Sequence, residues 1–241
     1  MAKKLYFNNS PEPFELSRTK IELFIQCPRC FYLDRKLGIS RPSIPGFTLN
    51  SAVDTLLKRE FDIHRANKEA HPLMAAYGIS AVPFEHEKME EWRHNFTGVR
   101  FHYQPTNFIV FGAVDDIWIN DKKELHVVDY KATSQDEEVN LEGRYKEGYK
   151  RQAEIYQWLL RQNGFQVSDI AYFVYANGRK DLEAFDGKLE FKVRIIPYLG
   201  NASWVSKKLE EIHKCLQSDE IPFPAFDCEY CAYARQANDL G

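Results

Sequence analysis

The sequence has no apolar run near the ~20 residues that a membrane-spanning helix requires, and its N-terminal stretch carries two lysines without an apolar segment of useful length. We therefore expect neither a membrane span nor a secretion signal. Internal repeats and low-complexity tracts are also absent, which excludes a repeat architecture.

An excess of charge of one sign is missing as well. The chain has 32 basic and 35 acidic residues, a formal net charge of −3. This excludes a protein that coats nucleic acid by bulk positive charge, so any such contact must come from a local basic surface or from metal ions. The chain has five cysteines, and this small and odd number does not suit a disulfide framework. We expect a reducing, cytoplasmic compartment in which the thiols are metal ligands or core residues.

What is present is the composition of an ordinary globular protein, with 44% hydrophobic and 28% charged residues. We predict one domain over residues 1–241, with a core at about 46–200 and a cysteine-bearing lobe formed from about 17–40 and 201–235. Apolar spacing and turn residues predict helices over 16–33, with an interruption at Pro28, and over 49–65, 144–162 and 201–217. Strands are predicted over 99–103, 107–119, 124–131, 170–176 and 189–196, the first three as a meander, with an irregular tail from Ile221. This order indicates a mixed α/β fold.

Asp129 and Lys131 are the first candidate site residues. They lie two apart on a predicted strand, so they share one face. A carboxylate that binds a divalent cation beside a lysine that orients water suits phosphodiester hydrolysis. The acid-x-Lys pattern occurs five times in the chain, but only here does an apolar lead, Val127-Val128, predict a buried acid that needs a cation.

Asp115 is the second candidate, in the strand that precedes Asp129. Pairing across the short turn is expected to bring both carboxylates within range of one Mg²⁺ or Mn²⁺ ion. Gln152 and Tyr156 lie four apart on the predicted helix that follows, and so on one helix face. A structural role remains the alternative for each of these residues taken alone.

Together these motifs, Gly112-x-x-Asp115, Asp129-x-Lys131 and Gln152-x-x-x-Tyr156, resemble the RecB-like branch of the PD-(D/E)XK nucleases. The resemblance implies a restriction-endonuclease-like mixed sheet flanked by helices, and a Mg²⁺- or Mn²⁺-dependent hydrolase. It also implies active-site roles for Asp115, Asp129, Lys131, Gln152 and Tyr156. The backbone carbonyl of Tyr130 would be a further metal ligand. The family's upstream Gly-x-x-x-His motif is replaced here by Asn50 and Asp54. Asp54 would then be a third carboxylate ligand, with a surface aspartate as the alternative.

Two Cys-x-x-Cys pairs, Cys27/Cys30 and Cys228/Cys231, lie almost 200 residues apart. Two such pairs predict a Cys₄ zinc site or an iron–sulfur cluster. The leader from Ser17 through Cys27-Pro-Arg-Cys30-Phe-Tyr32 resembles the iron–sulfur nucleases that include the CRISPR-associated RecB-like enzymes and the AddB-type nuclease domains. That resemblance favours a [4Fe-4S] cluster over Zn²⁺, although those proteins commonly divide their cysteines one and three.

Phosphate contacts are predicted for the basic residues at the start of the third helix, which are Arg144, Lys146, Lys150 and Arg151. The aromatic residues fall mostly at core spacing and predict no stacking platform. The resemblance implies a DNA exonuclease acting on single strands or ends in repair, recombination or CRISPR-type processing, possible protein partners and no membrane contact. The alternatives are a non-catalytic DNA-binding or scaffolding module, and a zinc ribbon that reads DNA.

Overall fold

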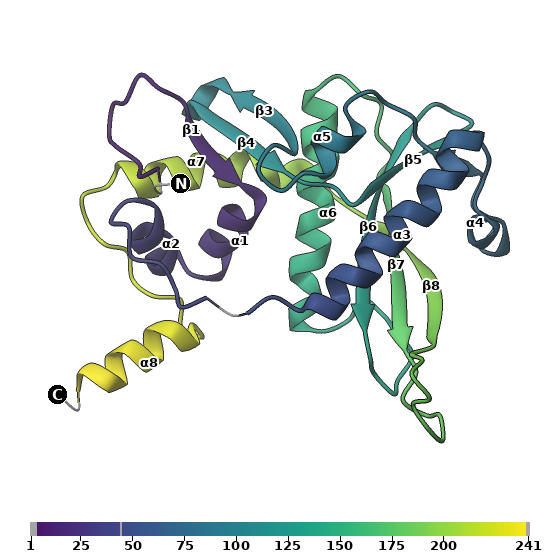
Figure 1. Ribbon diagram of the computed structural model, residues 1–241. Coiled ribbons are helices and arrows are strands. Elements are labelled where there is room, and N and C mark those ends of the chain that lie inside the picture. The colour runs from purple at the N-terminus through teal and green to yellow at the C-terminus, as the bar shows by residue number, and fades with distance from the viewer. Residues whose placement is uncertain (1–3, 44, 240–241) are drawn as a thin grey trace. The chain divides into compact units, whose positions relative to one another are not determined.

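The computed structural model describes residues 4–43 and 45–239, and the chain divides into two compact units (Figure 1). Unit 1 comprises Met1–Pro45, Arg100–Phe111 and Ser203–Gly241. Unit 2 comprises Gly46–Val99 and Gly112–Ala202. Since each unit combines segments that are distant in the sequence, neither can be read from one continuous stretch of chain.

The described part of unit 2 is built on a five-stranded sheet of order β2-β5-β6-β7-β8. The strands are β2 (Ala81–Pro83), β5 (Asp116–Asn120), β6 (Leu125–Thr133), β7 (Ile170–Gly178) and β8 (Phe191–Leu199). The pair β6 and β7 is parallel and every other pair is antiparallel, so the sheet is mixed. The central position of β6 buries it on both faces, so its first six residues, Leu125 to Tyr130, are all buried.

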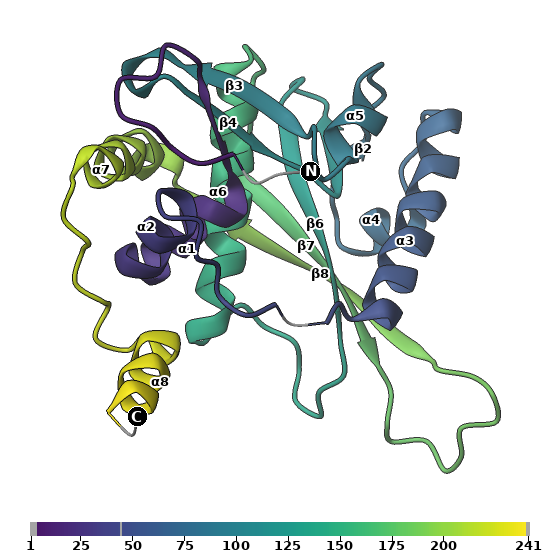
Figure 2. The ribbon, with the colours of Figure 1, turned by 60° about the vertical axis from the view of Figure 1, so that its left-hand side comes forward.

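Two long helices lie against opposite faces of this sheet, α3 (Thr48–Asn67) and α6 (Arg144–Gln162) (Figure 2). Leu57 and Phe61 of α3 pack on Val128 and Tyr130 of β6. Asp129, between Val128 and Tyr130 on β6, faces α6 instead, because side chains alternate along a strand. Unit 2 also contains the short helices α4 (Pro72–Ala76) and α5 (Met89–Arg93). The predicted fold class, a mixed sheet flanked by helices, is confirmed.

Unit 1 has a three-stranded sheet of order β1-β4-β3 in its described residues, with β1 and β4 parallel. Its elements are β1 (Phe14–Ser17), α1 (Arg18–Gln26), α2 (Pro28–Arg35), β3 (Val99–Tyr103), η1 (Gln104–Thr106), β4 (Phe108–Gly112), η2 (Ala202–Trp204), α7 (Val205–Gln217) and α8 (Glu229–Asn238). The sheet and helices pack around apolar residues such as Phe14, Leu16, Phe31 and Leu209.

Three sequence-based predictions are corrected. The stretch 107–119 is not one strand of a meander: β4 pairs with β1 and β3, whereas β5 pairs with β2 and β6. The β structure is interrupted after Gly112. The carbonyl oxygen of Gly112 would lie 2.5 Å from a Cβ at position 98, so only glycine fits at position 98. The predicted helix 16–33 begins only at Arg18, because Phe14–Ser17 form strand β1, whereas its predicted interruption at Pro28 is found one residue earlier, at Cys27. The tail predicted to be irregular is helical from Glu229, where α8 begins. Among the described helices, none is long and apolar enough to cross a membrane.

Candidate functional site

Strand β6 carries Asp129 and Lys131 on the face that α6 covers. Asp129 is fully buried, and its Oδ2 forms an ion pair with Lys131 Nζ, whose side chain is 16% exposed. The ammonium of Lys131 also lies over the ring of Tyr149, 4.7 Å from the ring centroid. In the pattern that we singled out among five in the sequence, the acid is buried and the lysine is fixed beside it. Asp34 of the Asp34/Lys36 pattern is buried as well, but it forms an ion pair with Lys20 across 2.8 Å, while Lys36 contacts Asp219.

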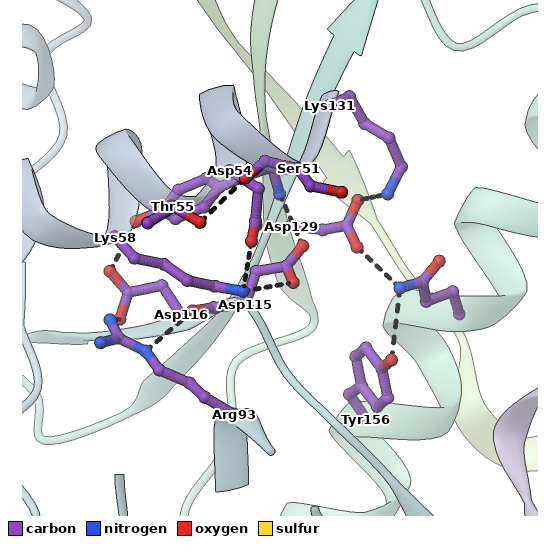
Figure 3. A network of polar contacts seen from close by, with 12 residues as sticks. Ser51, Asp54, Thr55, Lys58, Arg93, Asp115, Asp116, Asp129, Lys131 and Tyr156 are labelled. Atoms are coloured by element: carbon purple, nitrogen blue, oxygen red, sulfur yellow. Dashed lines mark hydrogen bonds and ion pairs between the residues drawn. The ribbon is translucent and has the colours of Figure 1, made fainter. Parts of the chain in front are cut away.

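Helix α6 brings Gln152 to the same carboxylate. Gln152 Nε2 donates to Asp129 Oδ1 across 2.8 Å and to the Tyr156 hydroxyl across 3.2 Å (Figure 3). The two residues lie one turn apart on the buried face of the helix, as their spacing predicts. The amide therefore holds one oxygen of Asp129 in place while Lys131 contacts the other.

Asp115 lies immediately before β5, across the β5–β6 pairing from Asp129. Its Oδ2 accepts a hydrogen bond from the Tyr130 backbone N–H across 3.0 Å, and its carbonyl oxygen accepts one from Arg93 Nε across 3.0 Å. Both contacts orient the aspartate relative to β6. The Tyr130 backbone thus borders the site, while its carbonyl stays a predicted ligand.

Lys58 joins Asp115 to Asp54, and the sequence-based prediction missed it. Its ammonium lies 2.8 Å from Asp54 Oδ2 and 3.4 Å from Asp115 Oδ1 (Figure 3). Asp54 and Lys58 are one turn apart on α3. The i,i+4 spacing was the available signal, but such pairs are common on exposed helices and do not by themselves indicate a site.

Electrostatics tie these groups together. Burial raises the pKa of Asp54, the Asp115 carboxylate raises it further, and Lys58 opposes both. For Lys58, burial acts to lower the pKa, but Asp115 and Asp54 outweigh burial and the net direction is upward. Lys131 behaves alike, because Asp129 and then Asp115 outweigh its burial. The site therefore holds three carboxylates against two lysines that stay protonated at neutral pH.

Asp116, next in the chain to Asp115, has a different environment. It is fully buried, and its Oδ1 lies 2.5 Å from Arg65 Nη2 and 3.1 Å from Arg93 Nη2. Its Oδ2 accepts from the Tyr130 hydroxyl across 2.7 Å. Both oxygens are thus engaged by internal donors, so Asp116 anchors β5 and Asp115 is the member of the pair that faces the other acids.

The donor set fits a hard divalent cation. Asp54, Asp115 and Asp129 offer carboxylate oxygens, the ligands that Mg²⁺ and Mn²⁺ prefer, and the Lys58 ammonium already lies between two of them. The three carboxylates do not form a closed shell: within the described ranges, only the four cysteines bring three or more ligand atoms within 4.8 Å of one another. A bound cation therefore requires Lys58 to move or to share its carboxylates.

The predicted phosphate-binding residues all lie on α6. Lys146 Nζ lies over the ring of Tyr175, 5.1 Å from its centroid, and Tyr175 pairs with Lys131 in the β6–β7 register. Lys150 forms an ion pair with Glu147 across 2.6 Å. Lys146 is thus the one of these two lysines that the structure brings beside the carboxylate site.

In unit 1, the four cysteines of the two Cys-x-x-Cys pairs meet. The Sγ atom of Cys30 lies 3.5 Å from that of Cys231 and 3.6 Å from that of Cys228, and the Sγ atoms of Cys27 and Cys231 lie 3.8 Å apart. All four sulfurs are within 4.8 Å of one another, and three of the residues are buried. Cys215 lies elsewhere, on α7, as a free thiol.

The surroundings of the cysteines shift the pKa values of their thiols in opposite directions, downward for Cys27 and upward for Cys30 and Cys231. Burial acts to raise the pKa of Cys27, but the backbone N–H groups of Cys30 and Ala225 donate to its Sγ and lower the pKa to about 7. Arg41 Nη2 donates to Cys228 Sγ across 3.5 Å. Burial raises the pKa of Cys231, which is consistent with four thiols that cannot all ionise without a cation. The cluster is therefore suited to a metal.

Residues 49–236 match a family model described as the PD-(D/E)XK nuclease superfamily. The matched range includes Asp54, Asp115, Asp129 and Lys131 together with the second cysteine pair, and begins after Cys27 and Cys30. No curated protein matches the chain.

Proposed function

Because this chain belongs to the PD-(D/E)XK nuclease superfamily, whose members are metal-dependent hydrolases of nucleic acid, we propose that it cleaves DNA phosphodiester bonds at the carboxylate site of unit 2. The observation that carries the proposal is the cluster that Lys58 and Lys131 form with Asp54, Asp115 and Asp129. Acids from α3, β6 and the start of β5 converge there, although they are far apart in the sequence.

Asp54, Asp115 and Asp129 would hold Mg²⁺ or Mn²⁺, with the Tyr130 carbonyl as a further ligand. When bound, the cation supplies Lewis-acid activation of the phosphate and of a water. Gln152 positions Asp129 by holding its Oδ1, and the Tyr156 hydroxyl in turn positions Gln152. Contacts of this kind around metal ligands typically change metal affinity 10- to 100-fold when removed.

Lys131 would orient the attacking water and stabilise the negative charge that develops on the phosphate. Its ammonium is within reach of the site because β6 directs Asp129 and Lys131 to the same face. The raised pKa keeps this ammonium charged at neutral pH, so Lys131 acts as a cation and not as a general base.

We propose single-stranded DNA or DNA ends as the substrate and exonucleolytic cleavage as the reaction. The support is the resemblance to the RecB-like enzymes and the place of Lys146 beside the site. Repair, recombination or CRISPR-type processing, with partner proteins, would be the context, and the free cysteines favour a reducing compartment such as the cytoplasm.

The test compares the wild type with Asp129→Asn and Lys131→Ala on labelled DNA with Mn²⁺ or Mg²⁺. The substrates are a linear single strand, a blunt duplex and a circular single strand of the same composition. Lys192→Ala is the matched control, since Glu190, just before β8, and Lys192, exposed on β8, repeat the acid-x-Lys pattern.

We expect the wild type and Lys192→Ala to shorten the linear strand and spare the circle, and both site variants to lose activity by about 100-fold or more. A wild type that binds DNA and cuts none of the three substrates would identify the alternative, a non-catalytic binding module. Cleavage of the circle would contradict the exonuclease assignment alone.

For the four cysteines we propose a [4Fe-4S] cluster, on the resemblance of the Cys27-Pro-Arg-Cys30 leader. One observation favours a second candidate, Zn²⁺. Tetrahedral Zn–S bonds of about 2.3 Å place sulfurs about 3.8 Å apart, close to the 3.5–3.8 Å found here. A four-iron cluster would hold the sulfurs farther apart. Anaerobic purification followed by iron and zinc analysis decides: about four irons with visible absorbance supports the cluster, and one zinc overturns it.

A further inference from the structure

An open hollow of about 1130 Å³ lies in unit 1 beside the cysteines. Its lining residues come from α2 and the residues that follow it, and from the irregular segment that leads into α8 and α8 itself. We call it the aromatic hollow, after four of its lining residues: Phe223, Phe226, Tyr230 and Tyr233.

These aromatic rings are not used to pack the core. Phe223 is 92% exposed, Phe226 is fully exposed at 107%, and Tyr233 is 75% exposed. Exposing large aromatic side chains costs hydrophobic stabilisation, and a group of them around one concavity is typical of a binding surface. The sequence did not predict this platform, because the spacing of these residues does not distinguish exposed rings from core rings.

Apart from the cysteines, the charged side chains that line the hollow are all basic. Arg29, Arg41 and Arg235 line it, and none of its lining residues is acidic. Arg41 is held in place: its guanidinium lies 4.5 Å from the centroid of the Tyr230 ring, and its Nη1 donates to Gln26 Oε1 across 3.0 Å. A surface that combines exposed aromatic faces with arginines and excludes carboxylates is complementary to a polyanion with flat apolar groups.

We infer that the aromatic hollow binds single-stranded DNA; this deepens the proposed function and rests on it. Unpaired bases stack on aromatic faces, and arginines contact the phosphates between them. A duplex hides its base faces inside the stack, so it offers the rings nothing comparable. Arg41 already donates to Cys228 and Gln26, but an apolar protein partner would offer Arg29 and Arg235 no anion, which makes single-stranded DNA the better match.

The experiment measures DNA binding by the full chain with its cysteine-bound metal. Asp129→Asn is present in every sample so that bound DNA stays intact. Fluorescence anisotropy of labelled dT20 and of a 20-base-pair duplex gives the dissociation constants. The test variant is Phe223→Ala/Phe226→Ala, and the matched control is Phe96→Ala/Phe185→Ala, which removes two rings of unit 2 that are 80% and 71% exposed.

We expect the test variant to bind dT20 at least about tenfold more weakly, because each stacked base contributes about 1–3 kcal/mol, and duplex binding to change less than about twofold. The control variant should match the parent on both ligands. Phe226→Trp should restore binding relative to Phe226→Ala and show tryptophan fluorescence that is quenched by dT20. Circular dichroism and metal content identical to the parent would show that the exposed rings were removed without unfolding.

Equal dT20 affinities for test and control variants would overturn the inference, as would an equal loss on the duplex. Failure of the proposed function looks different. In the chain without Asp129→Asn, absence of cleavage together with the expected loss of dT20 binding retains the hollow and removes the nuclease, whereas normal cleavage with unchanged dT20 binding does the reverse.

Discussion

Lys58 donates from its ammonium to the carboxylate of Asp54, one turn earlier on α3, across 2.8 Å. The same ammonium lies 3.4 Å from Asp115. A lysine thus compensates two of the acids that we propose as metal ligands, so Lys58 and the metal compete for the same oxygens.

Replacing Lys58 with Met is therefore expected to tighten Mn²⁺ binding by about tenfold, which is about 1.4 kcal/mol. The chain without metal should melt at a lower temperature, since Asp115 repels Asp54 once Lys58 is gone. Calorimetric titration with Mn²⁺ and thermal melts with and without the ion measure both effects. Lys180→Met removes an exposed lysine of unit 2 and should change neither; unchanged affinity in Lys58→Met contradicts the competition.

Tyr149 is expected to position Lys131 through its ring. Tyr149→Leu should lower the single-turnover cleavage rate by about 2- to 30-fold, as loss of a cation–π contact of about 0.5–2 kcal/mol predicts. Tyr149→Phe keeps the ring and should stay near the wild-type rate. Tyr145→Leu, on the same helix with an exposed ring, is the control. If Phe and Leu at position 149 reduce the rate equally, the hydroxyl and not the ring is responsible.

Asp116 is expected to contribute to stability. Asp116→Asn leaves Arg65 and Arg93 without their buried counter-charge, and breaking a buried ion pair costs about 3–5 kcal/mol. Urea unfolding should show a loss of this size, with little effect from Asp136→Asn at an exposed position. A variant that folds as stably as the wild type but loses metal binding would assign Asp116 to the site instead.

His126 is expected to make folding sensitive to acid. Burial lowers its pKa below the ordinary 6.5. The neutral ring donates from Nδ1 to the Ile170 carbonyl across 2.8 Å and accepts from Asn120 at Nε2 across 3.2 Å. Because the folded-state pKa of His126 is depressed, the stabilisation of the folded chain by the neutral ring is fully present above about pH 6.5. This stabilisation is lost as the pH falls below that value, because the unfolded chain then binds the proton more readily than the folded chain.

The free energy of unfolding is measured by urea titration between pH 5 and pH 8. As the pH is lowered from 8 to 5, it should decrease more steeply in the wild type than in His126→Phe. His102→Phe, which replaces a histidine on β3, is the comparison. The same slope in His126→Phe and the wild type would show that other groups cause the acid sensitivity.

Local pattern was sufficient for part of the fold. The helix over residues 144–162 and the strand over 99–103 have the bounds that their periodicity predicts. Both have one apolar face of regular spacing, so tertiary contacts and local preference agree. The apolar lead of Val127-Val128 likewise indicated a buried strand at Asp129, and Asp129 is fully buried.

The stretch 107–119 shows where local pattern stops. Its β propensity is similar on both sides of Gly112, but β4 and β5 join different sheets. Pairing partners decide which sheet a strand joins. The strand β4 pairs with Phe14–Ser17, which lies far earlier in the chain, whereas β5 pairs with Leu125–Thr133, which follows it after a short turn. The glycine pair at 98 and 112 marks the break only once the close approach is known.

Residue chemistry and spacing by themselves determined that this protein carries an acid–lysine pair on a buried strand, Gln152 and Tyr156 on one face of the helix after it, and two cysteine pairs. Tertiary structure decided the rest: that Lys58 lies between Asp54 and Asp115, that Asp116 is consumed by arginines, and that four aromatic rings surround a hollow with three arginines. The reason is physical, since a side chain's charge is set by its type, whereas its partners and exposure are set by residues that only folding brings near.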